Sequence, residues 1–461
     1  MQQDERQYTL AVMPQAVASS WKKNLKIFST ITLWKHQQSI YEWLAPMGSA
    51  MVSADMGVGK TLIGIKAGSP DGREVTYCDI TKGPVRKRVE SLDRALKFTP
   101  ADKSLFVLVN YESVWRGDLA KLVEKTPWTC LILDESHRVK SATGKASRWL
   151  ARLGLKHPKA KRLCLTGTPM PQSPLDLFGQ FRFLDSSVFG TSFSRMRARY
   201  AICDPRFPSK VRRYINQDEL ASKLDAHSYR VEADDVLNLP DAIHETIPIE
   251  LSPATRRLYK ALKDDLTGDL EAGKVTVGNA LSRFLRLQQA TSGVARLDDG
   301  GTVHIDGVPA KRRALEDRLN DLHATEPVVV FCRFRSDLEE VAAAARELGR
   351  EYAEVSGSRK DLERWQAGDA VILGVQIQSG GLGIDCSRAA FAFYYSLGFS
   401  LGDYEQSLAR LRRPGQTRMV RYYHLVATGT VDEQVYAALR ERRNVIEGVM
   451  ERLTDRMEVK S

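Results

Sequence analysis

The chain has 461 residues, of which 43% are hydrophobic and 27% charged, and its net charge is +11. At roughly 100–200 residues per domain, this length predicts about two to four globular domains, and the basic balance favours polyanionic partners such as nucleic acid. No apolar run is long enough to cross a membrane and the first residues lack an apolar signal core, so we expect a cytoplasmic protein without a membrane partner.

Short apolar and β-branched runs alternate with helical patterns, which predicts parallel strands buried on both faces in an α/β fold. The expected strands of the first half are 49–54, 73–79, 104–110, 130–135 and 162–167. Those of the second half are 327–333, 370–376, 390–395 and 420–426. Between these sets, residues 252–273 and 279–293 show helical periodicity, and a polar hairpin is expected around Asp299–Gly301. We therefore expect two lobes, at 1–228 and 229–461, with a helical insertion at about 250–325 in the second.

A glycine-rich loop follows the first of these strands. Residues 54–61 match the pattern G-x-x-x-x-G-K-S/T except at the first position, where Ala54 replaces glycine. Gly57 and Gly59 allow backbone amides to approach a phosphate chain, and the helix that follows presents its N-terminus to the same anion. We expect Lys60 to reach the β- and γ-phosphates of ATP and Thr61 to hold Mg²⁺. The alternative, a glycine turn before a core helix, is disfavoured because the G-K-T ending comes shortly after a strand.

An acidic pair ends a later strand. The run C-L-I-L at 130–133 leads directly into Asp134 and Glu135. Downstream of a phosphate loop, such a pair indicates hydrolysis, with Asp134 ordering the magnesium ion and Glu135 orienting and deprotonating the attacking water. A solvated turn is the alternative for an isolated pair of this kind.

Residues 134–137, D-E-S-H, resemble the DEAH-type box of superfamily-two helicases and translocases. Other blocks follow in that family's order: L-T-G-T-P-M-P-Q from Leu165, V-V-V-F-C-R-F at 328–334, Q-S-G-G-L-G-I-D-C-S at 378–387 and Q-S-L-A-R-L-R-R-P-G-Q-T at 406–417. The last block fits every fixed position of the family pattern Q-x-x-x-R-x-x-R-x-G-Q. Nearly the whole chain resembles the SWI/SNF-type branch of superfamily two, in a compact form similar to bacterial and phage members.

The resemblance implies two tandem RecA-like lobes that bind ATP and Mg²⁺ between them. In the first lobe, Gln37 would read the adenine, and the loop residues Asp55, Met56, Gly57, Val58 and Gly59 would contact the nucleotide. In the second lobe, Arg410 and Arg413 would be catalytic, and Gly383, Asp385 and Gln406 would lie near the nucleotide. Residues that would couple the nucleotide to DNA are His137, Thr166, Gly167, Thr168, Asn110 and Tyr111. The alternatives are a solvated basic helix face for the arginines and a strand-to-turn cap for the threonines.

One segment departs from the family pattern. After the glycine-rich loop, the chain reads Y-C-D-I-T-K-G-P-V-R-K-R, and Thr81–Lys82 is our interpretation of the expected DNA-contacting block. No accessory reader module is recognisable. We expect a monomeric, DNA-dependent ATPase that translocates on duplex DNA in a bacterial or phage-infected cell, with fork remodelling or strand annealing as a further expectation. The alternatives are a strand-separating helicase, a nucleotide-gated DNA clamp, and the motor subunit of a larger DNA-processing complex.

Overall fold

The computed structural model describes residues 6–205, 211–271, 277–296, 302–377 and 384–458. Contacts divide the chain into two compact units, which are described separately. Unit 1 comprises Met1–Leu237 with Arg443–Ser461, and unit 2 comprises Asn238–Arg442. The expected division between residues 228 and 229 falls inside a strand of unit 1, so the structure places the division later, after Leu237. No helix of the described residues is long and apolar enough to cross a membrane.

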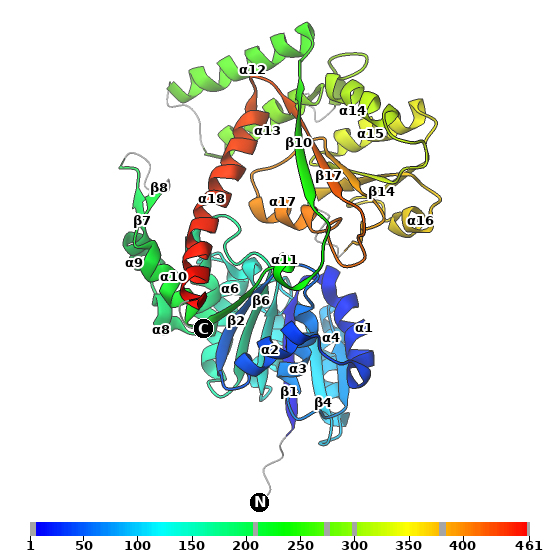
Figure 1. The fold of residues 1–461 in the computed structure, drawn as a ribbon. Helices are drawn as coiled ribbons and strands as arrows, with labels where there is room; N and C mark the ends of the chain where they lie inside the picture. The colour runs from blue at the N-terminus through cyan, green and yellow to red at the C-terminus, as the bar shows by residue number, and fades with distance from the viewer. Residues whose placement is uncertain (1–5, 206–210, 272–276, 297–301, 378–383, 459–461) are drawn as a thin grey trace, which may run out of the picture. The chain divides into compact units, whose positions relative to one another are not determined.

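Unit 1 is built on a seven-stranded parallel sheet (Figure 1). Its strand order is β3 (Val75–Asp79), β4 (Ser104–Asn110), β1 (Gln7–Met13), β5 (Cys130–Asp134), β6 (Lys161–Thr166), β2 (Ser49–Ala54) and β9 (Ser228–Val231). The five strands expected in this half are confirmed as β2 to β6. Two strands, β1 and β9, were not expected.

The first of these, β1, lies in the middle of the sheet. It pairs with β4 on one side and β5 on the other, so that Leu10 stands beside both Val107 and Leu131. Its last residue, Met13, aligns with Asn110 at the end of β4. The N-terminal segment is therefore part of the core of unit 1.

Helices cover both faces of this sheet. Alternate residues of β1, such as Leu10, pack in one core cluster with Leu92 and Leu119 of two helices. On the other face, the Trp21 ring meets the Phe106 ring of β4. The helices of unit 1 are α1 (Ala18–Ile27), α2 (Lys35–Leu44), α3 (Lys60–Gly68), α4 (Val85–Phe98), α5 (Gly117–Lys125), α6 (Lys145–Lys156), α7 (Leu177–Leu184), α8 (Ser186–Phe189), α9 (Phe193–Tyr200), α10 (Gln217–Asp225) and α11 (Ala233–Val236). A β-hairpin of β7 (Ala201–Cys203) and β8 (Val211–Tyr214) follows α9.

Unit 2 contains a six-stranded sheet, again parallel. Its order is β10 (Ala242–Ile249), β17 (Val420–Ala427), β16 (Phe391–Tyr394), β13 (Val328–Cys332), β15 (Ile372–Gln376) and β14 (Tyr352–Val355). The four strands expected in this half are confirmed, and the two edge strands, β10 and β14, are additional. The two parallel sheets with their helices establish the predicted α/β fold of two tandem RecA-like lobes.

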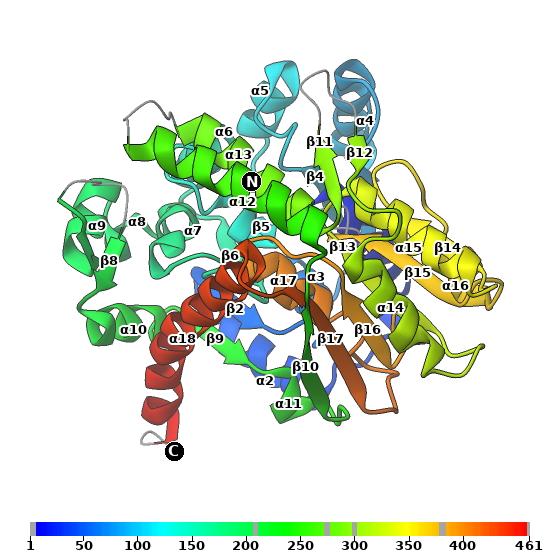
Figure 2. The same ribbon diagram turned by 90° about the horizontal axis from the view of Figure 1, so that it is seen from above.

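The expected helical insertion is present in unit 2. Figure 2 shows α12 (Pro253–Glu271) and α13 (Val277–Thr291) side by side, and the hairpin strands β11 (Val294–Arg296) and β12 (Thr302–His304) follow them. The antiparallel pairing of β11 with β12 confirms the hairpin, whereas its turn at Asp299–Gly301 lies outside the described residues. The remaining helices of unit 2 are α14 (Ala310–Asn320), α15 (Arg335–Glu347), α16 (Leu362–Ala367) and α17 (Leu401–Leu408). The last helix, α18 (Val431–Glu458), belongs to unit 2 up to Arg442 and to unit 1 from Arg443.

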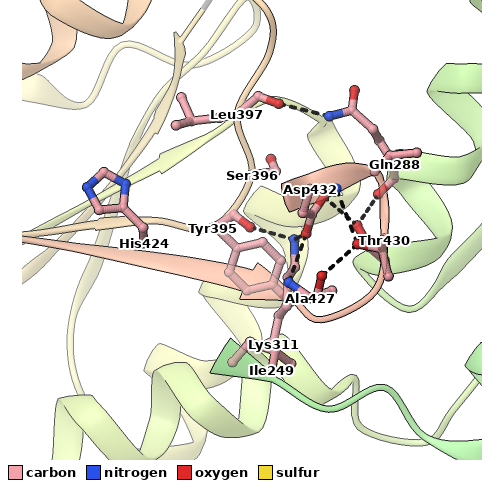
Figure 3. Close-up of polar contacts among 12 residues, drawn as sticks. Ile249, Gln288, Lys311, Tyr395, Ser396, Leu397, His424, Ala427, Thr430 and Asp432 are labelled. Carbon is pink, nitrogen blue, oxygen red and sulfur yellow. Dashed lines mark hydrogen bonds and ion pairs between the residues drawn. The ribbon is translucent and has the colours of Figure 1, made fainter. Parts of the chain in front are cut away.

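A buried polar cluster joins the insertion to the sheet of unit 2 (Figure 3). Lys311 of α14 is fully buried and forms an ion pair with Asp432 of α18, and its Nζ also donates to the backbone oxygen of Tyr395. Asp432 accepts further hydrogen bonds from the hydroxyl of Thr291 and the backbone N–H of Ala427. The cluster therefore links α13, α14, α18 and the ends of β16 and β17.

Candidate active site

The candidate site of unit 1 is assembled from three loops that follow adjacent strands. In the sheet order, β5, β6 and β2 are consecutive and parallel, so their carboxyl ends share one edge. The acidic loop at Asp134 and Glu135 follows β5, the threonine loop at 166–168 follows β6, and the glycine-rich loop at 55–59 follows β2. Ligands of open parallel sheets bind at this edge, beyond the carboxyl ends of the strands.

The glycine-rich loop has the backbone that a phosphate cradle requires. Gly57 and Gly59 have φ values of 87° and 90°, in the left-handed region that favours glycine. The helix α3 begins directly afterwards at Lys60, and Thr61 is its second residue. The ammonium of Lys60 is buried and donates to the backbone oxygens of Ala54 at 2.6 Å and Asp55 at 3.0 Å. A helix N-terminus with a lysine folded over the loop suits a polyphosphate.

Two predicted nucleotide residues hold this loop in place. Gln37 is buried, and its amide donates to the backbone oxygen of Val58 and accepts from the backbone N–H of Trp34. A side chain at position 59 would collide with Gln37, so Gly59 is needed there for space as well. Asp55 accepts from the backbone N–H of Ala233 at 3.0 Å and thus ties the loop to α11. The contact of Gln37 with adenine stays a prediction.

The acidic pair lies at the end of β5. Asp134 is 4% exposed; its Oδ1 accepts from the backbone N–H of Glu135 at 3.0 Å and its Oδ2 accepts from the indole N–H of Trp21 at 2.7 Å. Burial raises the pKa of Asp134 to about 6, and the charge of Glu135 acts in the same direction, whereas the Trp21 hydrogen bond and the Lys60 charge oppose it. A buried carboxylate near a lysine is a suitable partner for a divalent cation.

Glu135 has an unusual backbone. Its φ is 52°, and among the described residues only Asn216 shares a positive φ without being glycine. Such conformations cost free energy and cluster at functional sites. The left-handed turn places the Glu135 carboxylate 3.3 Å from the Nδ1 of His137, with the side chain only 14% exposed. This geometry fits the predicted role of Glu135 toward a water molecule, and the role itself stays a prediction.

The acidic loop is connected to the threonine loop. The Nδ1 of His137 lies 3.2 Å from the hydroxyl of Thr166, and that hydroxyl also accepts from the backbone N–H of Thr168. A Cβ at Gly167 would lie 3.5 Å from the Nζ of Lys60, so this loop passes beside that lysine. The hydroxyl of Thr168 is buried without a hydrogen-bond partner. Four predicted residues, His137 and 166–168, therefore meet at one place.

The predicted DNA-contact residues at the end of β4 are buried. Tyr111 is 5% exposed and its hydroxyl donates to the backbone oxygen of Asp134 at 2.8 Å. The side chain of Asn110 accepts a short hydrogen bond from Ser113. Direct contact between the Tyr111 ring and DNA is therefore not supported, and any coupling by Tyr111 acts through the acidic loop. Thr81 is likewise buried and bonded to Asp79, whereas Lys82 is exposed.

In unit 2, the arginine-rich block begins on α17, which carries Gln406, and continues into the turn that contains Arg410 and Arg413. Arg413 donates to the backbone oxygen of Ile384, and its Nε lies 3.7 Å from the carboxylate of Asp385. The backbone oxygen of Arg410 accepts from the N–H of Cys386. These contacts join the block to the loop that precedes β16. Gly383 lies outside the described residues.

One site residue could not be found from the sequence. Trp21 of α1 belongs to none of the motifs considered, and it contacts Asp134 from a position 113 residues earlier in the chain. The only signal near it is the apolar run of β1, which precedes α1. The contact depends on the pairing of β1 with β5, and local sequence patterns cannot predict which strands pair.

The geometry of unit 1 fits ATP and Mg²⁺. The loop amides and Lys60 are suited to bind the phosphates, and Asp134 and Thr61 offer oxygen ligands for the metal ion. The buried hydroxyl of Thr168 has no hydrogen-bond partner, so it is available to bond to a ligand there. With two parallel α/β lobes, these features are typical of a helicase-like ATPase.

Comparisons with known proteins agree with this class. The family model described as SNF2-related domain matches residues 86–293. Protein p41 of Acyrthosiphon pisum secondary endosymbiont phage 1 is 28% identical over 386 residues, which cover 79% of this chain and 80% of p41. Mouse ZRANB3, named a DNA annealing helicase and endonuclease, is 26% identical and shares 68% of this chain but 29% of its own length. YwqA of Bacillus subtilis, named for an ATP-dependent helicase or translocase, is 24% identical over 80% of this chain and 40% of YwqA.

The match to the SNF2-related domain and the similarity to these relatives support an ATPase of the SWI/SNF type within helicase superfamily two.

Proposed function

We propose that this chain is a motor that tracks along duplex DNA and does not separate its strands. The observation that supports the motor most directly is the position of the threonine loop, which passes beside Lys60 at Gly167 and contacts His137 through the Thr166 hydroxyl. Because the threonine loop lies between the glycine-rich loop and the acidic loop, loss of the γ-phosphate would change the conformation of residues away from the nucleotide. Such a connection is what an ATPase needs to convert hydrolysis into movement.

The proposed roles follow the chemistry of each side chain. Lys60 neutralises the β- and γ-phosphates, Thr61 and Asp134 hold Mg²⁺, and Glu135 orients the attacking water and takes its proton. Magnesium supplies charge neutralisation at the phosphates. Arg410 and Arg413 of the second lobe would stabilise the charge of the transition state when the two lobes close on the nucleotide. Each lobe would then hold the phosphate backbone in turn as the lobes close and open.

Backbone contact without sequence preference suits a tracking motor. The net charge of +11 provides the electrostatic attraction, and phosphate contacts carry no sequence information. Such contacts do not distinguish base sequences, so a motor that uses them can move over any duplex. In this proposal, unit 1 is the ATP-binding lobe, unit 2 is the helicase lobe, and both contact the phosphate backbone.

Strand separation needs a wedge or pin, and the described strands of the two hairpins do not offer one. The strands β11 and β12, at Val294–Arg296 and Thr302–His304, contain no Phe, Tyr or Trp. In the described part of the β7–β8 hairpin, the aromatic residue is Tyr214, which packs against the core cluster of unit 1. Stacking platforms for freed bases are usually exposed aromatic side chains. These hairpins therefore favour tracking over unwinding.

Two substrates distinguish the possibilities. A triplex loses its third strand to tracking alone, whereas a forked duplex is released only by strand separation. We expect ATP-dependent triplex displacement with little fork unwinding, and no displacement by the Glu135→Gln variant. Efficient unwinding without triplex displacement would favour a helicase. ATP-stimulated DNA retention with activity on neither substrate would favour a gated clamp, or a subunit that needs its partners.

Strand annealing is a second candidate, favoured by the similarity to a mouse protein named a DNA annealing helicase. A plasmid that carries a protein-coated single-stranded bubble tests it. Annealing predicts ATP-dependent closure of the bubble by the wild-type chain and not by Lys60→Ala. Closure that does not need ATP would contradict this candidate.

A further inference from the structure

Trp21 is buried against the acidic loop of unit 1. Its side chain is 0% exposed, and its indole N–H donates to Oδ2 of Asp134 at 2.7 Å. The other carboxylate oxygen accepts from the backbone N–H of Glu135 at 3.0 Å. The backbone oxygen of Asp134 is also occupied, because it accepts from the hydroxyl of Tyr111. The Asp134 carboxylate is thus held at both of its oxygens.

The Trp21 ring has little freedom to move. It packs against Phe106 of β4 with ring centroids 6.5 Å apart. The ring also lies beside Gly64 of α3, where an added Cβ would stand 3.1 Å from it. The Trp21 ring therefore packs against α3, the helix that begins at Lys60, and its N–H is hydrogen-bonded to Asp134. A buried indole N–H needs an acceptor, and here the acceptor is a side chain of the candidate site.

We infer that Trp21 is a positioning residue for the carboxylate that holds Mg²⁺. Its fixed N–H restrains Oδ2, so that the carboxylate of Asp134 keeps one orientation while the ion binds and leaves. Residues that hydrogen-bond to a metal-binding carboxylate orient it, and their loss weakens metal affinity. This inference rests on the proposed role of Asp134. It assigns a function to the N-terminal segment β1–α1, which carries none of the recognised motifs.

The test is the Mg²⁺ dependence of nucleotide binding, which needs no hydrolysis. A fluorescent ADP analogue is titrated onto the full chain in EDTA and then at increasing Mg²⁺. Trp21→Phe keeps a ring and removes the N–H donor, and we expect it to raise the Mg²⁺ midpoint by about 10- to 100-fold. Its affinity for the analogue in EDTA should equal that of the wild type. The matched control is Trp128→Phe, because the Trp128 N–H donates at 2.7 Å to the backbone oxygen of Val123 in the same unit; its Mg²⁺ midpoint should not move.

Asp134→Asn separates this inference from the proposed function. A wild-type Mg²⁺ midpoint in Asp134→Asn would overturn the assignment of Asp134 itself. A shifted midpoint in Asp134→Asn with a wild-type midpoint in Trp21→Phe would overturn the role of Trp21 alone. If Trp21→Phe does not fold, β-(3-benzothienyl)alanine at position 21 keeps the bicyclic shape and replaces the N–H by sulfur. An equal loss of binding with and without Mg²⁺ in the folded variant would show a structural role only and contradict the inference.

Discussion

The Nζ of Lys311 lies 2.6 Å from Oδ2 of Asp432, and both side chains are buried in unit 2 (Figure 3). The lysine is fully enclosed, with its second contact at the backbone oxygen of Tyr395. The pair fastens the first turn of α18 to α14. Because water does not reach these charges, each depends on the other for neutralisation.

Removal of one partner should destabilise unit 2. Lys311→Met leaves the Asp432 charge uncompensated, and we expect a loss of about 3–5 kcal/mol in the free energy of unfolding. The double variant Lys311→Met with Asp432→Asn should recover much of the loss, since no charge remains buried. A denaturant titration that follows the unfolding of unit 2 measures the free energy of unfolding of both variants. As a control, Arg256→Met removes a solvent-exposed pair with Glu250 in the same unit and should leave the midpoint unchanged. A single variant as stable as the wild type would contradict the prediction.

Lys60 and Glu135 should affect different steps. Lys60→Ala removes the ammonium that lies over the glycine-rich loop, so nucleotide affinity should fall. Glu135→Gln keeps the shape and removes the base, so the variant should bind ATP normally and hydrolyse it very slowly. Binding of a fluorescent analogue and phosphate release report the two steps. The control is Glu112→Gln, an exposed carboxylate of the same unit. Normal turnover in Glu135→Gln would show that another group is the base.

Arg410 and Arg413 should change turnover far more than affinity. Loss of an arginine that neutralises the transition state typically costs about 10³–10⁵ in rate. We expect such a decrease in kcat for Arg410→Ala or Arg413→Ala at saturating DNA. Arg412, which lies between them and donates to the backbone oxygen of Pro240, is the control. Rates near the wild type in both variants would exclude a site shared by the two lobes.

The hydroxyl of Thr166 should couple hydrolysis to DNA. It contacts His137 and accepts from the backbone N–H of Thr168, and Thr166→Val removes both interactions with little change in volume. We expect the ATPase rate without DNA to persist while stimulation by duplex DNA declines. The measurement is the ratio of the ATPase rate with duplex DNA to the rate without it, for Thr166→Val and the wild type. Full stimulation in the variant would place the coupling elsewhere.

Affinity for duplex DNA should depend steeply on salt and little on sequence. Each phosphate neutralised contributes about −0.9 to the slope of log K against log salt concentration. Fluorescence anisotropy with several unrelated duplexes at matched salt measures the slope and the spread between sequences. A strong preference for one duplex at fixed salt would show base contacts and contradict the prediction.

Sequence patterns located the strands that are buried between neighbours, with the exception of β1. The run V-V-V-F-C at 328–332 is continuous and apolar because β13 has a strand on each side and helices on both faces. The edge strands β9, β10 and β14 include polar residues, for example Arg230 and His244, since one side of each lacks a neighbouring strand. They were missed for this reason. Motif residues such as Lys60 and Asp134 could be located because the glycine-rich loop follows a predicted strand and the acidic pair ends another.

Long-range contacts explain what the patterns did not show. Trp21 reaches Asp134 only because β1 is inserted between β4 and β5. Tyr111 lies in a motif-like block but is buried by the same packing. Local periodicity reports which face of an element is apolar. It does not report which distant element covers that face.

The central position of β1 has a consequence for how unit 1 folds. During synthesis, residues 7–13 are made before either partner, and the backbone of Tyr8 meets Thr129 across a separation of 121 residues. Until β4 and β5 have both emerged from the ribosome, the apolar residues 7–13 have no strand to pair with and are exposed to solvent. Pairings of such high contact order form slowly, and unpaired apolar strands are prone to aggregate. Removal of residues 7–13 would leave β4 and β5 with two open edges inside the sheet, so a truncated chain should accumulate in inclusion bodies.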